Sequence, residues 1–312
     1  MTVRIAFLGN DPWSVPALDA IAGEPDLAVV LVVTNPPKAA GRGDTVRPTA
    51  VAEAARRLGV PLVEAAGVRV GPGAEGLAAA KPDAIVVVAY GEILRGEALT
   101  MATYGAVNLH FSLLPRWRGA SPVQHAIAAG DAITGVTVMR MDTGLDTGPI
   151  LAQLEEQIRP DDTAGSLGTR LAHIGALLLV GVLRMSPDGG VPPRPQDDRA
   201  ATVAPRIGPE ERAIDWEGSP EAIVRWVRAL SPRPGATTLF RGQALKVLAA
   251  AVDHQGSAGS PGTIVETDDR GVLVRAAGGG VRLVEVAPAG RKRMSGAAWA
   301  RGARFASDER LG

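Results

Sequence analysis

The sequence contains no cysteine among its 312 residues, and only 4% of them are aromatic. The absence of cysteine excludes disulfide bonds, thiol nucleophiles and cysteine-ligated zinc, and it suits a cytoplasmic enzyme. The chain has no run of about 18 uninterrupted apolar residues, so we expect no transmembrane helix and no membrane partner. Its first residues, Met1–Trp13, have no basic segment ahead of an apolar one, which predicts a strand and not a signal peptide.

An excess of charge of one sign is also missing, because 33 Lys and Arg balance 33 Asp and Glu. This balance argues against a protein dedicated to binding nucleic acid. The two parts of the chain differ, however: residues 1–205 hold 17 basic against 21 acidic residues, and residues 206–312 hold 16 against 12. The balance of −4 against +4 indicates that the C-terminal part could meet a phosphate backbone.

The first 150 residues alternate between short β-branched runs and helix-like segments. The runs are continuously apolar, as in strands that are covered on both faces, so the pattern predicts a Rossmann-like, doubly wound, mostly parallel sheet of the α/β class. The expected strands are Val3–Gly9, Leu27–Thr34, Asp83–Tyr90, Ala106–Ser112 and Gly135–Asp142. The expected helices are Pro16–Ala22, Pro48–Leu58, Gly73–Ala80 and Pro122–Ala129.

The remainder of the chain predicts a second domain. A helical pattern after Asp162 runs through Leu183, and a segment rich in Pro, Gly and Asp follows it. From about Ile207 a helix, Pro220–Leu230, precedes five short strand-like runs, which predict a small OB-like antiparallel β-barrel. We therefore expect a catalytic domain at 1–188, a linker at 189–206 and a C-terminal barrel domain at 207–312.

Two polar residues stand out in the apolar stretch AVNLHFS. Asn108 and His110 are two positions apart, so on a strand both side chains point to the same face. Asn can donate to a developing oxyanion, and His can exchange protons near neutral pH. Asp146, in the Gly-flanked loop after the next run, could orient the imidazole and help to move a proton. Asp142 is a competing carboxylate, which we interpret mainly as a turn residue.

Several common catalytic motifs are missing from the sequence. It has no Gly-x-Ser-x-Gly turn, no phosphate loop of the Lys-Ser/Thr type, and one glycine where a dinucleotide fingerprint has three. Acyl transfer from a bound carrier, without a covalent enzyme intermediate, fits the groups that remain. We expect no metal site.

The stretches NLHFSLLPRWRGASPV and DTGLDTGPI resemble the signature motifs of the folate-dependent formyltransferases. The segments AAGRGDTVRPTAVAEAARRLGVP, VVVAYGEIL, RAIDW, RALSPRPGA and VEVAPAGRKRMSG narrow the resemblance to the methionyl-tRNA formyltransferases, over nearly the whole chain. The resemblance implies that 10-formyltetrahydrofolate is the formyl donor and that the α-amine of initiator Met-tRNA is the acceptor. It also implies a role in translation initiation and a monomer.

The resemblance assigns roles by position. Asn108, His110 and Asp146 match the catalytic trio, in which Asn108 and protonated His110 stabilise the oxyanion while Asp146 orients His110. The segment lining the tetrahydrofolate site is matched by Ser112, Leu113, Leu114 and Pro115. The residues expected to contact the tRNA are Arg42, Arg118, Arg291, Lys292 and Arg293. The resemblance implies this role for Arg42, whereas the charge and the place in the chain of the other four suggest it for them.

The sequence departs from the family pattern in places and leaves alternatives open. Phe111 stands where relatives often carry a small residue or proline, and Asp44 and Thr45 stand where some carry lysines. The same trio could serve a formyltransferase for an amino sugar or another small amine, or a formyl-folate hydrolase. A third alternative is an RNA-binding protein with an inactive formyltransferase domain, which the intact trio disfavours.

Overall fold

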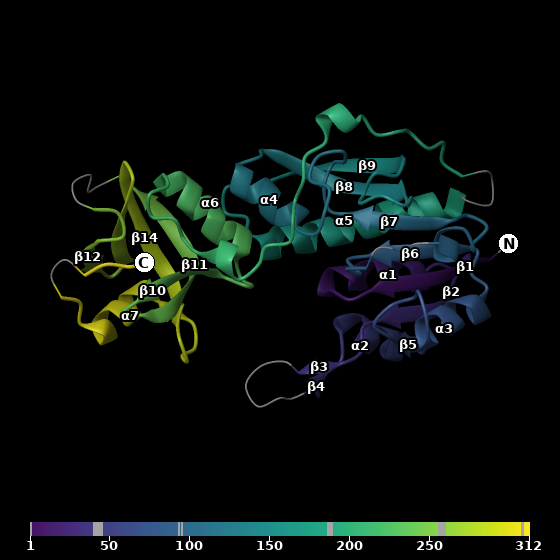
Figure 1. Cartoon of the computed structure of the whole chain (residues 1–312), viewed down its shortest axis with the longest axis horizontal. Coiled ribbons are helices and arrows are strands. Elements are labelled where there is room, and N and C mark those ends of the chain that lie inside the picture. The colour runs from purple at the N-terminus through teal and green to yellow at the C-terminus, as the bar shows by residue number, and fades with distance from the viewer. Residues whose placement is uncertain are drawn as a thin grey trace. The chain divides into compact units, whose positions relative to one another are not determined.

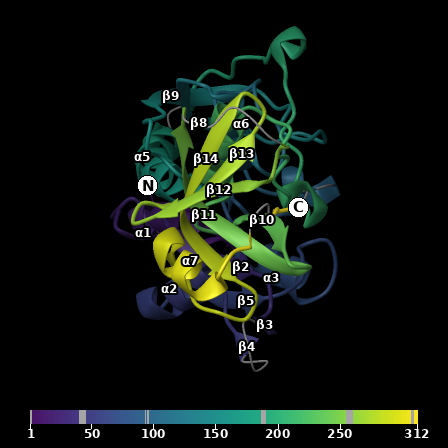
Figure 2. The ribbon, with the colours of Figure 1, turned by 90° about the vertical axis from the view of Figure 1, so that its left-hand side faces the viewer.

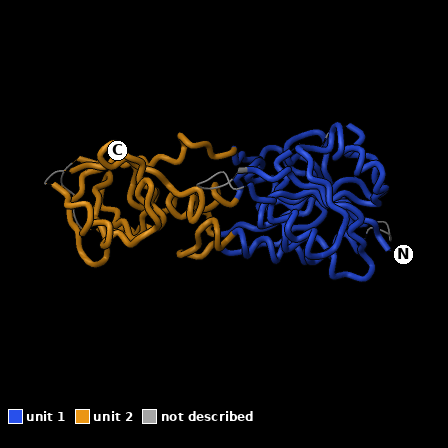
Figure 3. Tube along the Cα trace, turned by 90° about the horizontal axis from the view of Figure 1, so that it is seen from below, with its two compact units in different colours: residues 1–122, 133–157, 168–205 blue, residues 123–132, 158–167, 206–312 orange. Residues whose placement is uncertain are grey.

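The computed structural model describes residues 2–39, 46–92, 94, 96–185, 190–254, 260–306 and 309–312. Contacts divide the chain into two compact units, which are coloured separately in Figure 3. The first unit comprises residues 1–122, 133–157 and 168–205, and the second comprises residues 123–132, 158–167 and 206–312. Each unit is built on its own sheet.

The first unit contains a seven-stranded sheet in the order β5-β2-β1-β6-β7-β8-β9 (Figure 1). The pairs from β5 through β7 are parallel, whereas β8 is antiparallel to both β7 and β9. The strands are β1 (Val3–Gly9), β2 (Leu27–Thr34), β5 (Leu62–Glu64), β6 (Ala84–Val88), β7 (Ala106–His110), β8 (Ile133–Arg140) and β9 (Ile150–Gln157). Short strands β3 (Lys38–Ala39) and β4 (Val46–Arg47) pair separately.

Helices cover both faces of this sheet, which explains its apolar strands. The helices are α1 (Val15–Ala22), α2 (Ala50–Leu58), α3 (Pro72–Ala80) and α5 (Ala164–Met185), with 3₁₀ turns at Pro12–Ser14, Gly96–Leu99 and Asp198–Ala200. Helix α2 begins where the Thr49 hydroxyl accepts the Ala52 N–H and ends at Gly59 in a left-handed conformation. Leu77 of α3 packs with Leu8, Leu31 and Ile85 on one face. Leu109 of β7 packs against Gly175 of α5 on the other.

Helix α5 is the one helix in the described part of the chain that is long and apolar enough to cross a membrane, with a mean hydropathy of 1.6. Its buried leucines include Leu167, Leu171, Leu179 and Leu183, which recur along one face of the helix. More than half of its most apolar window, 56%, is buried inside the protein. These features are those of a core helix.

The second unit contains an antiparallel sheet in the order β10-β11-β14-β13-β12, which faces the viewer in Figure 2. Its strands are β10 (Ala236–Phe240), β11 (Gln243–Asp253), β12 (Ile264–Asp268), β13 (Gly271–Ala276) and β14 (Gly279–Pro288), and β15 (Met294–Ser295) pairs with β14. Its helices are α6 (Pro220–Leu230) and α7 (Gly296–Ala303), with a 3₁₀ turn at Glu210–Arg212; α4 (Pro122–Ala129) lies almost wholly in this unit. Trp216, Val247, Leu283, Trp299 and Leu311 belong to the core.

The last residues of the chain join the two edge strands of this sheet. Leu311 forms a bridge with Phe240 at the end of β10, and Arg310 forms one with Thr263 beside β12. The Ile264 N–H donates to the Glu309 carbonyl at 2.8 Å, and the Gly312 N–H donates to the Leu239 carbonyl at 3.1 Å. The segment 309–312 therefore connects the end of β10 with the start of β12 and closes the sheet into a barrel there.

The fold class expected from the sequence is confirmed, since a mostly parallel sheet is followed by an antiparallel one. The expected strand at 135–142 corresponds to β8, which runs antiparallel to β7 within the mostly parallel sheet. Strands β5 and β9 and helix α7 were not expected. Strand β9 carries Glu155, Glu156 and Gln157 at an edge of the sheet, so it lacks the apolar run of a central strand.

Replacing Leu311 with alanine should lower the free energy of unfolding of the second unit by about 2–4 kcal/mol, because the side chain is only 3% exposed in the barrel core. Urea denaturation followed by tryptophan fluorescence measures the change. Leu239→Ala is the matched control, because Leu239 lies on β10 with 47% of its surface exposed, and it should cost less than about 1 kcal/mol. Equal losses in the two variants would contradict closure by Leu311.

Candidate active site

Strand β7 presents Asn108 and His110 on one face of the sheet. Leu109, between them, faces α5, so both neighbours point away from that helix. Asn108 is in register with Val87 of β6, and Val87 belongs to the buried cluster that contains Leu77 and Tyr90. The two polar side chains therefore lie on the face of the sheet that α3 covers, at and near the carboxyl end of β7.

The structure brings Asn108, His110 and Asp146 together. The Asn108 amide Nδ2 donates to Asp146 Oδ1 at 3.4 Å, and Nδ1 of His110 lies 3.7 Å from Asp146 Oδ2. His110 is 6% exposed and Asp146 is 14% exposed, so the group is largely screened from solvent. Both distances exceed the usual hydrogen-bond length of about 2.9 Å, so the three groups are adjacent but not tightly bonded.

Asp146 reaches the trio by an unexpected route. As expected, it follows a neighbouring strand, β8, but that strand is antiparallel to β7, and its end at Arg140 pairs with Val107 near the start of β7. The loop between β8 and β9 must therefore fold back toward the other end of β7. Asp146 itself has a φ of 53°, a left-handed conformation that costs a non-glycine residue about 1–2 kcal/mol. The surrounding contacts must hold it there.

Two backbone groups in the segment after β7 also contact the trio. The Gly119 N–H donates to Asp146 Oδ2 at 2.8 Å, and His110 Nε2 donates to the Trp117 carbonyl at 2.9 Å. Gly119 has a φ of 123°, and a Cβ at that position would lie 2.6 Å from the Ala204 carbonyl oxygen, so only glycine fits. No sequence pattern predicts these two contacts, because both are made by main-chain atoms.

The hydrogen bond with the Trp117 carbonyl shows which nitrogen of the His110 imidazole carries a proton in this conformation. A carbonyl oxygen only accepts, so the proton resides on His110 Nε2, and Nδ1 faces the Asp146 carboxylate. A second proton on Nδ1 would point at Asp146. The carboxylate is thus placed to stabilise a protonated imidazole.

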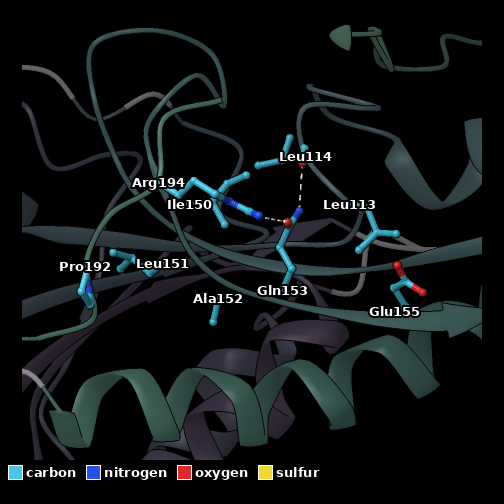
Figure 4. A pocket seen from close by; sticks show the side chains of 9 residues that line it. All are labelled: Leu113, Leu114, Ile150, Leu151, Ala152, Gln153, Glu155, Pro192 and Arg194. Carbon is cyan, nitrogen blue, oxygen red and sulfur yellow. Dashed lines mark hydrogen bonds between the residues drawn. The ribbon is translucent and has the colours of Figure 1, made fainter. Parts of the chain in front are cut away.

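The segment Ser112–Pro115 is partly internal. The Ser112 hydroxyl donates to the Arg116 carbonyl at 2.7 Å, and Leu114 is buried with Met139 and Ile150. Leu113 and Pro115 are half-buried, and Leu113 is one of the residues that line a pocket of about 590 Å³ beside β9. Figure 4 shows Gln153 there, donating to the Leu114 carbonyl at 2.9 Å and accepting from Arg194 at 2.6 Å. The trio does not line this pocket.

A second place for a ligand is the point where the strand order reverses, between the carboxyl ends of β1 and β6. Asn10 follows β1, and its amide Oδ1 accepts from Thr34 Oγ1 at 2.9 Å while its Nδ2 donates to the Tyr90 carbonyl. The buried hydroxyl of Tyr90 has no hydrogen-bond partner within the described ranges. Burial, with a smaller effect of Glu92, raises the pKa of Tyr90 to about 12, so this phenol is a neutral donor at physiological pH.

Asp142, the competing carboxylate, is a turn residue in the structure. Its Oδ1 accepts from the Gly144 N–H at 2.9 Å and from the Thr147 hydroxyl at 2.7 Å. These bonds stabilise the loop that carries Asp146. Among the residues that the structure describes, no group of three or more His, Asp or Glu side chains could hold a metal ion.

The basic residues predicted to contact tRNA have different surroundings. Arg42 lies outside the described residues. Arg118 is 11% exposed, and its guanidinium donates to Gln196 and Asp198 within the protein. Arg291, Lys292 and Arg293 are exposed after β14 in the second unit, where Arg293 pairs with Glu285.

Comparison with known proteins identifies relatives over the whole chain. The formyl transferase family model matches residues 3–183, and the model of the formyl transferase C-terminal domain matches residues 206–304. The chain is 40% identical to the methionyl-tRNA formyltransferase of Magnetococcus marinus, covering 99% of this chain and 98% of that one. It is 43% identical to that of Thermus thermophilus, covering 99% of each chain.

A solved structure shares the fold at lower identity. It is the N-formyltransferase of Helicobacter canadensis in complex with folinic acid and dTDP-3-aminofucose, with 15% identity and a TM-score of 0.65, covering 94% of this chain and all of that one. The family models and the relatives over the full length agree. The chain therefore belongs to the formyl transferase family.

Proposed function

We propose that the protein transfers the formyl group of 10-formyltetrahydrofolate to the α-amine of methionine on initiator Met-tRNA, for translation initiation. The proposal is carried by the convergence of Asn108, His110 and Asp146 in a chain 40–43% identical, from end to end, to methionyl-tRNA formyltransferases. The protein is a formyltransferase whose one-carbon donor is a formyl-tetrahydrofolate.

The trio divides the chemistry between its members. The amine of the methionyl group attacks the formyl carbon, and negative charge develops on the formyl oxygen. One N–H of Asn108 Nδ2 contacts Asp146, and the other is oriented by that contact to donate to the formyl oxygen. His110 Nε2 reaches the same oxygen by exchanging the Trp117 carbonyl for it.

Asp146 takes part in removing the proton of the attacking amine. Its carboxylate is held by the Gly119 N–H and faces His110 Nδ1, so it also stabilises the positive charge of a protonated imidazole. The bond between the formyl carbon and N10 then breaks, its electrons return to N10, and N10 takes up a proton in place of the one lost by the amine, so that the folate leaves as tetrahydrofolate. No covalent bond to the protein is formed at any step.

The folate is assigned to the segment after β7. The half-buried side chains of Leu113 and Pro115 offer apolar surface to it, and Ser112 and Leu114 support them from within the core. Tyr90, at the carboxyl end of β6, supplies a neutral hydroxyl donor on the face of the sheet that carries the trio.

The tRNA is assigned to basic residues in both parts of the chain. The phosphates would be contacted by Arg42 and, in the second unit, by Arg291, Lys292 and Arg293. Arg118 would contribute the N–H groups of its guanidinium that do not bond to Gln196 or Asp198. A tRNA-contacting domain at 207–312, separate from a catalytic domain that contains residues 1–188, belongs to the same proposal; the segment 189–206 joins the two in sequence. So do a monomeric state and a cytoplasmic location.

Transfer of labelled formyl from 10-formyltetrahydrofolate tests the acceptor directly. We expect label on Met-tRNA, and little on a free amino sugar or in water as formate. Label mainly on the amino sugar would favour the small-amine alternative, label in formate a hydrolase, and transfer to none of the three a protein that only binds RNA.

His110→Ala and Asp146→Ala should each lower kcat at least about 100-fold, because each removes a group that acts on the charge formed in the reaction. Circular dichroism should show that both variants remain folded. His173→Ala is the matched control, since His173 is exposed on α5 and bonds to the Thr169 carbonyl of the same helix, and its kcat should be unchanged. Near-normal turnover in either variant would refute the role given to that residue.

Replacing Arg291, Lys292 and Arg293 together with glutamine should raise the KM for Met-tRNA about tenfold at physiological salt while kcat is retained. The slope of log(KM) against log[salt] should become shallower, because fewer phosphate charges are neutralised. Arg270→Gln is a control, because Arg270 is exposed in the same unit and paired with Asp268. An unchanged KM in the triple variant would remove this segment from the tRNA surface.

A further inference from the structure

The segment 190–205, which leads from α5 toward α6 in Figure 1, lies against the loops that hold the trio. Its composition predicted a linker, but its main chain is bonded in the first unit. The Arg118 N–H donates to the Thr202 carbonyl at 2.9 Å, and the Ala204 N–H donates to the Arg118 carbonyl at 2.7 Å. The Trp117 N–H donates to the Thr202 hydroxyl at 2.9 Å.

These bonds fix the two main-chain groups that contact the trio. Trp117, whose carbonyl accepts from His110, and Gly119, whose N–H donates to Asp146, flank Arg118 in sequence. Because Arg118 is bonded through both its N–H and its carbonyl, its neighbours have little freedom to move.

Gln196 connects this segment with the loop that carries Asp146. Its amide Nε2 donates to the Asp146 carbonyl at 2.8 Å and to the Gly148 carbonyl at 2.7 Å. Its Oε1 accepts from Arg118 Nε at 3.1 Å and from Arg118 Nη2 at 2.8 Å. The orientation of the amide follows from chemistry, since carbonyls only accept and a guanidinium only donates.

This arrangement accounts for the left-handed backbone of Asp146. Such a conformation persists only where the surroundings determine it, and the carbonyl of Asp146 is bonded directly to Gln196. One side chain thus joins the loop that presents the carboxylate to the loop that bonds both His110 and that carboxylate.

We propose that Gln196 is a positioning residue, which holds the Asp146 carboxylate beside His110 through its two amide donors, and that the segment 190–205 is part of the catalytic unit. The proposal rests on the role given to Asp146 above. The side chain of Gln196 bonds to the loop of Asp146 and to Arg118, so we expect its effect on turnover to pass through Asp146.

Gln196→Ala and Gln196→Glu in the full-length protein test this proposal. Glutamate keeps the acceptor for Arg118 but loses both donors to the Asp146 loop. We expect both variants to lower kcat by about tenfold to a hundredfold, because a carboxylate displaced by about 1 Å has that effect, with the KM values for both substrates within about twofold of the wild type. Arg199→Ala is the matched control, since Arg199 is 91% exposed on the same segment, and its kcat should be unchanged.

A double-mutant cycle distinguishes positioning from a separate role. In an Asp146→Ala background, adding Gln196→Ala should lower the residual kcat no further, because its target is gone. A full additional loss, a wild-type kcat in Gln196→Glu, or a change confined to KM would overturn the proposal. If Asp146→Ala alone retained normal turnover, the catalytic assignment of Asp146 would fail instead, which is a distinguishable result.

Discussion

The arrangement of this site depends on one carboxylate being held in a conformation that its own backbone disfavours. Asp146 has a positive φ, and its two oxygens have different neighbours: Asn108 contacts Oδ1, while Gly119 and His110 approach Oδ2. In the proposed reaction, a carboxylate with these neighbours stabilises positive charge on the imidazole and orients the amide donor. Each of these effects requires that the loop between β8 and β9 not relax, so contacts at the main chain of that loop matter as much as the side chain.

The direction of β8 is what makes the loop necessary. In an entirely parallel sheet the residue after the strand would already lie at the carboxyl edge, whereas the antiparallel β8 ends near the start of β7. The chain has to return, and it does so through a turn held by Asp142 and ends at the edge strand β9. Because the chain turns back after β8, the loop between β8 and β9 can be held by residues outside the sheet, such as Gln196.

Much of this could be predicted from the sequence, and the limits have physical causes. The apolar runs predicted the central strands, and the i, i+2 spacing of Asn108 and His110 correctly placed both on one face. The motif and the Gly-flanked loop placed Asp146 near His110, as the structure has it, whereas the direction of β8 was not predicted, because strand direction leaves no mark on a short apolar run. Gly119 and Trp117 act through an N–H and a carbonyl, which every residue type carries, and Gln196 lies in a segment whose composition predicts only a linker.

The position of Gln196 has a consequence for where the protein can be divided. A fragment that ended at Met185, the last residue of α5, would include the whole first family match. It would contain every strand of the seven-stranded sheet and all three polar residues of the trio. It would also expose the carbonyls of Asp146 and Gly148 to water and release the strained loop from its anchor. If Gln196 positions Asp146 as proposed, the boundary of the sheet and the boundary of the active catalytic unit differ by the segment 190–205, which both continues the chain toward the second unit and holds the loop of Asp146 in place.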